Sequence, residues 1–235
     1  MQNDKITLKD LSIFSNDGGS DVFGLLDFNT TRAGRECLRK HILEPPQNFD
    51  ALQRTQAVVR FWSQHPDLWP TIISNGTLVM LEKFFEAADE SAAPPSGLSL
   101  VLGPFFQKLL NRNQYFFTQF SISHLSDFLK GCQQLTEILK REDVPASLQA
   151  ALQDIAGELK EARLLQDVIA VNKETPFAEL QRLSYHARRE MKNMVYRLIG
   201  HYAHLDACQS MGKATRQLKW VFPKMVESKP VCFEE

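Results

Sequence analysis

The chain has 235 residues, of which 43% are hydrophobic and 23% charged, and its formal net charge is -1. These values describe an ordinary globular protein with enough chain for a sizeable core, and they exclude a domain that binds nucleic acid with a strongly basic surface. The four cysteines are far apart and form no CxxC pair, which favours reduced thiols over a disulfide framework or a zinc site. No apolar run approaches the ~20 residues that span a bilayer, and no basic-then-apolar leader opens the chain. We therefore expect a cytoplasmic protein without a membrane partner.

Two helices are predicted in the first fifth of the chain. The stretch SDVFGLLDF indicates a short helix with Ser20 as its cap and Asp21 in its first turn. The stretch TTRAGRECLRKHIL indicates a second helix, which must end by Glu44 because Pro45-Pro46 cannot continue it. Its predicted buried face consists of residues that recur every four positions: Gly34, Leu38 and Ile42.

A third helix is predicted from about residue 50 to residue 63, with Asn48 as its cap and His65-Pro66 as its end. Its predicted buried stripe consists of Leu52, Thr55, Val59 and Trp62. Residues 67–88 also favour helix, with Asn75-Gly76 as a candidate break. The stretch SAAPPSG, residues 91–97, is typical of a loop.

The rest of the chain is predicted to be almost purely helical, over residues 98–112, 115–141, 146–173 and 176–209. Proline-containing breaks fall at Asp143–Pro145 and Glu174–Pro176. Only Leu98–Val101 and Val221–Phe222 are candidate strands, so the predicted fold class is all-α. The last two helices would be about 28 and 34 residues long, or roughly 42 to 51 Å, which suits a bundle or a pair of levers.

Motifs for catalysis or phosphate binding are absent from the sequence. It contains neither GxxxxGK[ST] nor GxGxxG, and no GxSxG nucleophile motif. Gly18-Gly19-Ser20 is better explained as a flexible turn before a helix than as an anion site. Gly34 is better explained by close packing than by phosphate binding. The chain by itself is therefore predicted to be no enzyme and to hold no cofactor and no metal.

Two groups of polar residues could have a binding function or only a structural one. His201 and His204 stand three residues apart beside Asp206 and could share a metal, but HExxH is absent and no third ligand is evident, which favours packing. A basic stretch with interleaved tyrosines is the candidate nucleic-acid face: Arg182, Arg188, Arg189, Lys192 and Arg197. Glu179 and Glu190 dilute its charge, so a solvated helix face is the favoured interpretation.

Two stretches, in order, resemble the core domain of the MutS family of DNA mismatch repair ATPases. FGLLDFNTTRAGRECLRKHILEPPQNFDALQRTQAVVRFW, residues 23–62, is similar to the opening of that domain. The matching positions are Leu25, Leu26, Asp27, Thr31, Gly34, Arg35, Leu38, Arg39, Pro45, Arg54, Ala57 and Val58. HYAHLDACQSMGKATRQLKWVFPKM, residues 201–225, is similar to the returning lever helix. The matching positions there are Leu205, Asp206, Ser210, Ala214, Phe222 and Pro223.

The resemblance implies a single core and lever domain over residues 1–235. It would consist of a core hub (1–65), a helical middle (66–175) without a recognisable signature, and the returning lever (176–235). In the family an ATPase domain that binds ATP and magnesium follows, so we expect a domain fragment, from a short relative without the mismatch-recognition domain. The parent is expected to bind mismatched or branched DNA and to dimerise. The chain itself would couple the ATPase domain to DNA binding and would have no catalytic activity of its own. The alternative is a helical nucleic-acid-binding or adaptor module that uses the basic face of residues 182–197.

The resemblance also suggests a role for three arginines of the hub. Arg35, Arg39 and Arg54 would fix the hub through ion pairs or helix carbonyls. Ordinary solvated arginines are the alternative, because most surface ion pairs contribute little to stability.

Overall fold

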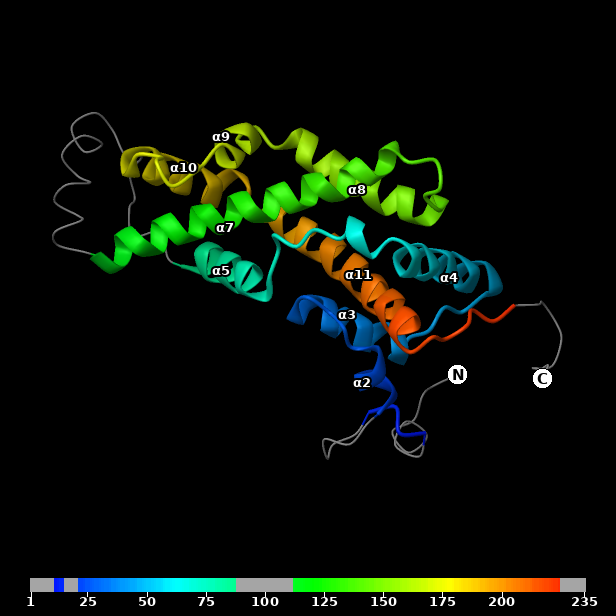
Figure 1. The fold of residues 1–235 in the computed structure, drawn as a ribbon. Coiled ribbons are helices and arrows are strands. Elements are labelled where there is room, and N and C mark those ends of the chain that lie inside the picture. The colour runs from blue at the N-terminus through cyan, green and yellow to red at the C-terminus, as the bar shows by residue number, and fades with distance from the viewer. Residues whose placement is uncertain (1–10, 15–20, 88–111, 225–235) are drawn as a thin grey trace. The chain divides into compact units, whose positions relative to one another are not determined.

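The computed structural model describes residues 11–14, 21–87 and 112–224, shown as coloured ribbon in Figure 1. Every regular element within these ranges is an α-helix or a short 3-10 helix, which confirms the all-α prediction. In the same ranges no helix has both the length and the apolar content needed to cross a bilayer. Several predictions concern residues outside the described ranges: those for residues 91–97, 98–101, Gly18-Gly19-Ser20 and most of the helix at 98–112.

The chain divides into two compact units, each assembled from separate segments. Unit 1 combines Met1–Trp69, Arg141–Ala150 and Ala203–Glu235, and unit 2 combines Pro70–Lys140 and Ala151–Tyr202. The division that the resemblance implies runs consecutively along the chain, whereas each compact unit combines segments that are separate in sequence. The last long helix, α11 (Lys192–Gln217), has residues in both units.

Unit 1 contains α2 (Val22–Leu26), α3 (Arg32–Leu43), α4 (Phe49–Gln64), η1 (Pro66–Leu68) and the second part of α11. Asn48 caps α4 as predicted, because its side-chain oxygen accepts a hydrogen bond from the Ala51 amide. Glu44 ends α3 just before the two prolines, also as predicted. Leu38, Phe23 and Ala207 form a buried hydrophobic cluster in this unit. The predicted packed face of α3 is therefore confirmed.

Unit 2 contains α5 (Asn75–Glu86), α7 (Arg112–Glu137), η2 (Ile138–Lys140), α9 (Leu165–Ile169) and α10 (Phe177–Glu190), with most of α8 (Ala146–Glu161). In Figure 1, α5, α9 and α10 lie along α7, and each of them contacts it. The buried face of α7 repeats at helical spacing: Ile122, Leu125, Phe128, Leu129, Cys132 and Leu135. α7 is therefore the central helix of unit 2.

Three predictions about the helices before residue 88 differ in detail from the structure. Asp21, rather than Ser20, is the cap of α2, because its carboxylate accepts the hydrogen bond from the Gly24 amide. Residues 67–88, predicted as helix with a candidate break at Asn75-Gly76, are helical only from Asn75, where α5 begins after a reciprocal cap between Ser74 and Thr77. Leu52, predicted to be buried, is 39% exposed.

The two longest predicted helices are each interrupted. Residues 146–173 form α8 and α9 around a turn at 162–164, and residues 176–209 form α10 and α11 around a single non-helical residue, Met191. Residues 221 and 222 are in no strand. The breaks predicted at Asp143–Pro145 and Glu174–Pro176 are confirmed, since helices α8 and α10 begin directly after these prolines.

Candidate functional site

The candidate site is a hydrogen-bonded junction in unit 1 between α11 and the segment that leads into α3. Asp206 of α11 is fully buried, and both of its carboxylate oxygens accept hydrogen bonds from this segment. Oδ1 accepts from the Thr30 amide at 2.9 Å, and Oδ2 accepts from the Thr31 amide at 2.9 Å and the Thr31 hydroxyl at 2.7 Å. We call this set of contacts, together with those of Ser210 below, the α11 clasp.

The Asp206 carboxylate acts directly on the start of α3. Thr31 is the N-cap of that helix, and its hydroxyl oxygen accepts a hydrogen bond from the Gly34 amide at 3.0 Å. The carboxylate therefore lies at the positive end of the helix dipole and orients the capping hydroxyl. Burial raises the pKa of Asp206, while the hydrogen bonds from Thr30 and Thr31 and the charge of Lys213 act in the opposite direction.

Helix α3 approaches Asp206 closely at Gly34. A methyl group at Gly34 would lie 2.2 Å from Asp206 Oδ2 and 2.7 Å from Asp206 Cβ. Real side chains never come this close, so only glycine fits here without a shift of the carboxylate. Close packing at Gly34 was predicted and is present, although the neighbouring group is the Asp206 side chain rather than a backbone segment.

Ser210 lies one helical turn after Asp206 and extends the clasp toward α2. Its hydroxyl accepts a hydrogen bond from the Phe28 amide at 2.7 Å and donates one to the Leu26 carbonyl at 2.6 Å. The i, i+4 spacing places both polar side chains on one face of α11. Two side chains of one helix thus hold the backbone of residues 26–31.

The same part of α11 lies close to α4. A methyl group at Gly212 would lie 2.8 Å from the Ser63 amide nitrogen and 2.9 Å from Trp62 Cβ. Beyond the helix, Phe222 lies under the guanidinium of Arg60, with 4.8 Å between that group and the ring centre, and the Pro223 carbonyl accepts a hydrogen bond from Gln56. The segment after α11 is therefore held along α4.

The arginines predicted to fix the hub have three different environments. Arg35 pairs with Asp27 at 2.8 Å, although 58% of its side chain is exposed. The guanidinium of Arg39 lies over the Phe14 ring, 4.3 Å from its centre. Arg54 is exposed, and its main-chain carbonyl accepts a hydrogen bond from Ser147. An ion pair thus exists only for the first of them among the described contacts.

The leucines of the predicted core motif also differ in their surroundings. Leu38 and Leu205 are buried, and Leu26 packs against the cluster around Phe23. Leu25, by contrast, is 41% exposed. The apolar positions of the motif are therefore core residues in most cases but not in all.

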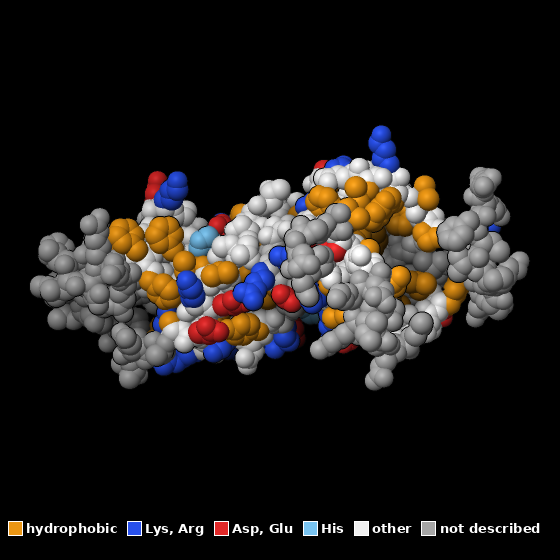
Figure 2. Space-filling view, turned by 90° about the horizontal axis from the view of Figure 1, so that it is seen from below, with side chains coloured by type: hydrophobic (Ala, Val, Ile, Leu, Met, Phe, Trp, Pro, Cys, Tyr) orange, Lys and Arg blue, Asp and Glu red, His pale blue; other side chains and the backbone are white. Residues whose placement is uncertain are grey.

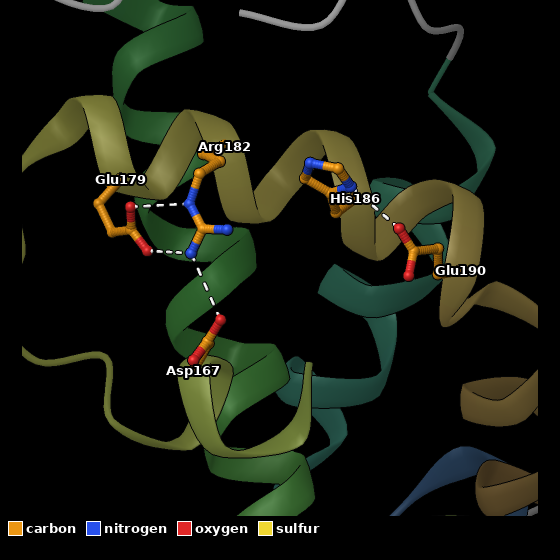
Figure 3. Close-up of polar contacts among 5 residues, drawn as sticks. All are labelled: Asp167, Glu179, Arg182, His186 and Glu190. Carbon is orange, nitrogen blue, oxygen red and sulfur yellow. Dashed lines mark hydrogen bonds and ion pairs between the residues drawn. The ribbon is translucent and has the colours of Figure 1, made fainter. Parts of the chain in front are cut away.

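Acidic neighbours accompany two arginines of the predicted basic face, which lies in unit 2. Figure 3 shows Arg182 of α10 between Glu179 and Asp167, and His186 beside Glu190 on the same helix. Arg197 of α11 forms two hydrogen bonds with Glu158, at 2.6 and 2.8 Å. On the face that Figure 2 shows, Lys and Arg side chains are interspersed with Asp and Glu side chains.

The other three residues of this predicted face have different surroundings. Arg188 lies over the Phe84 ring, 4.6 Å from its centre, and Arg189 lies over the Tyr185 ring at 3.9 Å. Lys192 is exposed at the start of α11. The five residues come from two helices, α10 and α11, that Met191 separates, rather than from one continuous helix.

A third group of functional side chains lies in unit 1, where the sequence suggested only part of it. His204 Nδ1 lies 3.3 Å from His41 Nε2, and Cys37 Sγ lies 3.7 Å from the same nitrogen. Asp206 faces the Thr30–Thr31 backbone. The signal that sequence reasoning missed is the i, i+4 spacing of Cys37 and His41 on α3.

Comparison with known proteins identifies no relative of this chain. No family model matches the chain, and no curated protein or solved structure is significantly similar to it.

Proposed function

We propose that the chain is the non-catalytic core and lever region of a MutS-like DNA repair ATPase. The observation that carries this proposal is the α11 clasp. The two stretches that resemble the family are far apart in sequence, with Thr30 and Asp206 separated by 176 positions, and they hydrogen-bond to each other through Asp206 and Ser210. Residues that recur together in a family for a structural reason are expected to make such a contact.

The clasp has the physical properties that a coupling junction needs. The Asp206 carboxylate is buried, its three donors lie at 2.7 to 2.9 Å, and Gly34 leaves it no free space. A shift of α11 along its axis would break these hydrogen bonds, so the segment before α3 is expected to move with the helix. α11 has 26 residues and thus a length of about 39 Å, enough to carry a displacement over a long distance.

In this proposal the chemistry belongs to other parts of the parent protein. The sequence has no Walker A motif, so ATP and magnesium would bind in an ATPase domain encoded downstream. Engagement of mismatched or branched DNA, and dimerisation, would likewise belong to the parent. The role of this chain would be to link the nucleotide bound in the ATPase domain to the affinity for DNA.

ATP hydrolysis tests the proposal. The isolated chain is expected to show no turnover, whereas the protein extended by its downstream coding sequence is expected to hydrolyse ATP and to respond to DNA. Ser210→Ala in the extended protein removes two hydrogen bonds of the clasp and should reduce the response to DNA, with basal turnover retained. Ser147→Ala, which removes an exposed hydrogen bond to the Arg54 carbonyl, is the matched control. Robust turnover by the isolated chain would refute the proposal.

The alternative function is nucleic-acid binding by the face of Arg182, Arg188, Arg189, Lys192 and Arg197. The carboxylates that accompany Arg182 and Arg197 weigh against it, because they neutralise charge that phosphates would otherwise attract.

A salt titration of DNA binding separates the two functions. If the alternative holds, binding by the isolated chain weakens steeply with salt and is lost in the double variant Arg188→Glu, Arg189→Glu. The charge-matched control is Lys160→Glu with Lys173→Glu, two exposed positions outside this face. The coupling function predicts weak binding that both double variants change equally.

A further inference from the structure

We propose that Cys37, His41 and His204 form a binding site for a zinc-type transition-metal ion. The proposal does not depend on the coupling function, because it rests only on the geometry of these three side chains. Cys37 and His41 lie one turn apart on the same face of α3, and His204 comes from α11. The three atoms that would bind the ion lie within 4.8 Å of one another.

The measured separations fit the edges of a tetrahedral site. Metal–sulfur and metal–nitrogen bonds of about 2.3 and 2.05 Å imply a sulfur–nitrogen edge of roughly 3.6 Å and a nitrogen–nitrogen edge of roughly 3.3 Å. The observed separations are 3.7 Å from Cys37 Sγ to His41 Nε2 and 3.3 Å from His204 Nδ1 to His41 Nε2. The atoms of the one edge without a given distance lie within 4.8 Å, and rotation of the exposed His204 side chain would bring them closer.

The surroundings suit a cation that enters from solvent. Cys37 and His41 are half-buried and His204 is exposed, so the site has both an apolar wall and an open side. The Phe23–Leu38–Ala207 cluster, against which Cys37 packs, supplies that wall. Among the nearby charges, exposed Lys40 acts on the Cys37 thiol more strongly than Asp206, and its ammonium group lies 3.9 Å from the Glu44 carboxylate.

The donor set defines the class of ion. One thiolate and two imidazoles are the ligands of zinc and of its close analogue cobalt, whereas calcium and magnesium take oxygen ligands. Three protein ligands leave a fourth position for water or another small ligand. Binding replaces the thiol proton by the metal, so one proton is released to solvent for each ion bound through Cys37. No electron transfer is involved.

A titration of the reduced 235-residue chain with Co²⁺ tests the site. We expect one Co²⁺ per chain, a thiolate-to-cobalt charge-transfer absorption, and displacement of the Co²⁺ by Zn²⁺. Cys37→Ser should abolish the charge-transfer absorption. His204→Gln should weaken Co²⁺ binding by at least about tenfold. Because His204 is exposed, its substitution is not expected to impair folding.

His201→Gln provides the matched control, since His201 lies one turn earlier on α11 and is not part of the cluster. It should bind Co²⁺ as tightly as the unmodified chain. The proposal is overturned if Co²⁺ produces no charge-transfer absorption, or if His204→Gln and His201→Gln bind it equally. In either case the three side chains are only packed together, as the edge-on contact of the two imidazole rings would then explain.

Discussion

Substitution of Gly34 by alanine tests the packing of the α11 clasp. In an ordinary helix this change stabilises a protein by about 0.5–1 kcal/mol, because glycine has the higher backbone entropy when unfolded. Here the new methyl group would lie 2.2 Å from Asp206 Oδ2, so either the helix or the carboxylate must move. Overpacking costs about 1–3 kcal/mol, and weakened hydrogen bonds to a buried carboxylate cost about 1.5–3 kcal/mol more. We expect a net destabilisation of about 2–5 kcal/mol.

Urea unfolding of Gly34→Ala measures this effect. All three tryptophans, Trp62, Trp69 and Trp220, belong to unit 1, so tryptophan fluorescence reports on the unit that contains the clasp. The free energy of unfolding follows from the transition midpoint and slope.

Two other glycines serve as matched controls. Gly157 in α8 and Gly200 in α11 are exposed helical residues, and a methyl group at either position meets no atom within 4 Å. Alanine at these positions should leave stability unchanged or raise it by up to about 1 kcal/mol, measured by circular dichroism because both residues belong to unit 2. A Gly34→Ala variant as stable as the unmodified chain would show that the close approach described above is wrong.

Three further substitutions are informative. Asp206→Ala should destabilise unit 1 by about 2–4 kcal/mol in the same fluorescence assay, because it leaves backbone amides without their acceptor. The control Asp154→Ala, at an exposed helical site, should change the free energy of unfolding by less than about 0.5 kcal/mol. Equal effects of the two substitutions would contradict the described role of Asp206. Arg35→Ala should cost less than about 1 kcal/mol, since 58% of the Arg35 side chain is exposed in its ion pair with Asp27; a larger loss would mean that this pair contributes substantially to the stability of unit 1. Lys219→Gly should raise the free energy of unfolding by about 0.5–1 kcal/mol, because Lys219 has a φ of 54° after α11, and a lower free energy of unfolding would refute that reasoning.

Local signals in the sequence were sufficient to predict the first helices of unit 1. Asn48 and the pair Pro45-Pro46 mark helix ends through their own chemistry, and the spacing of Gly34 and Leu38 defines a packed face. The interruptions at residues 162–164 and at Met191 have no such signal, because neither contains glycine or proline. Tertiary packing decides where these helices break, and a single sequence does not contain that information in local form.

The candidate sites were predictable only in part. The resemblance named Asp206, Thr31 and Gly34 as motif residues, but no rule of spacing connects positions so far apart, so their direct contact came from the structure. The metal cluster was missed for the same reason. His204 was noticed beside His201, whereas its neighbours in space are Cys37 and His41 on another helix.

The coupling function is best tested by ATP turnover, measured in parallel on the isolated chain and on the protein extended by its downstream coding sequence. We expect no turnover by the isolated chain, DNA-stimulated turnover by the extended protein, and loss of that stimulation in its Ser210→Ala variant. Turnover by the isolated chain, or a downstream sequence without a nucleotide-binding motif, would contradict it.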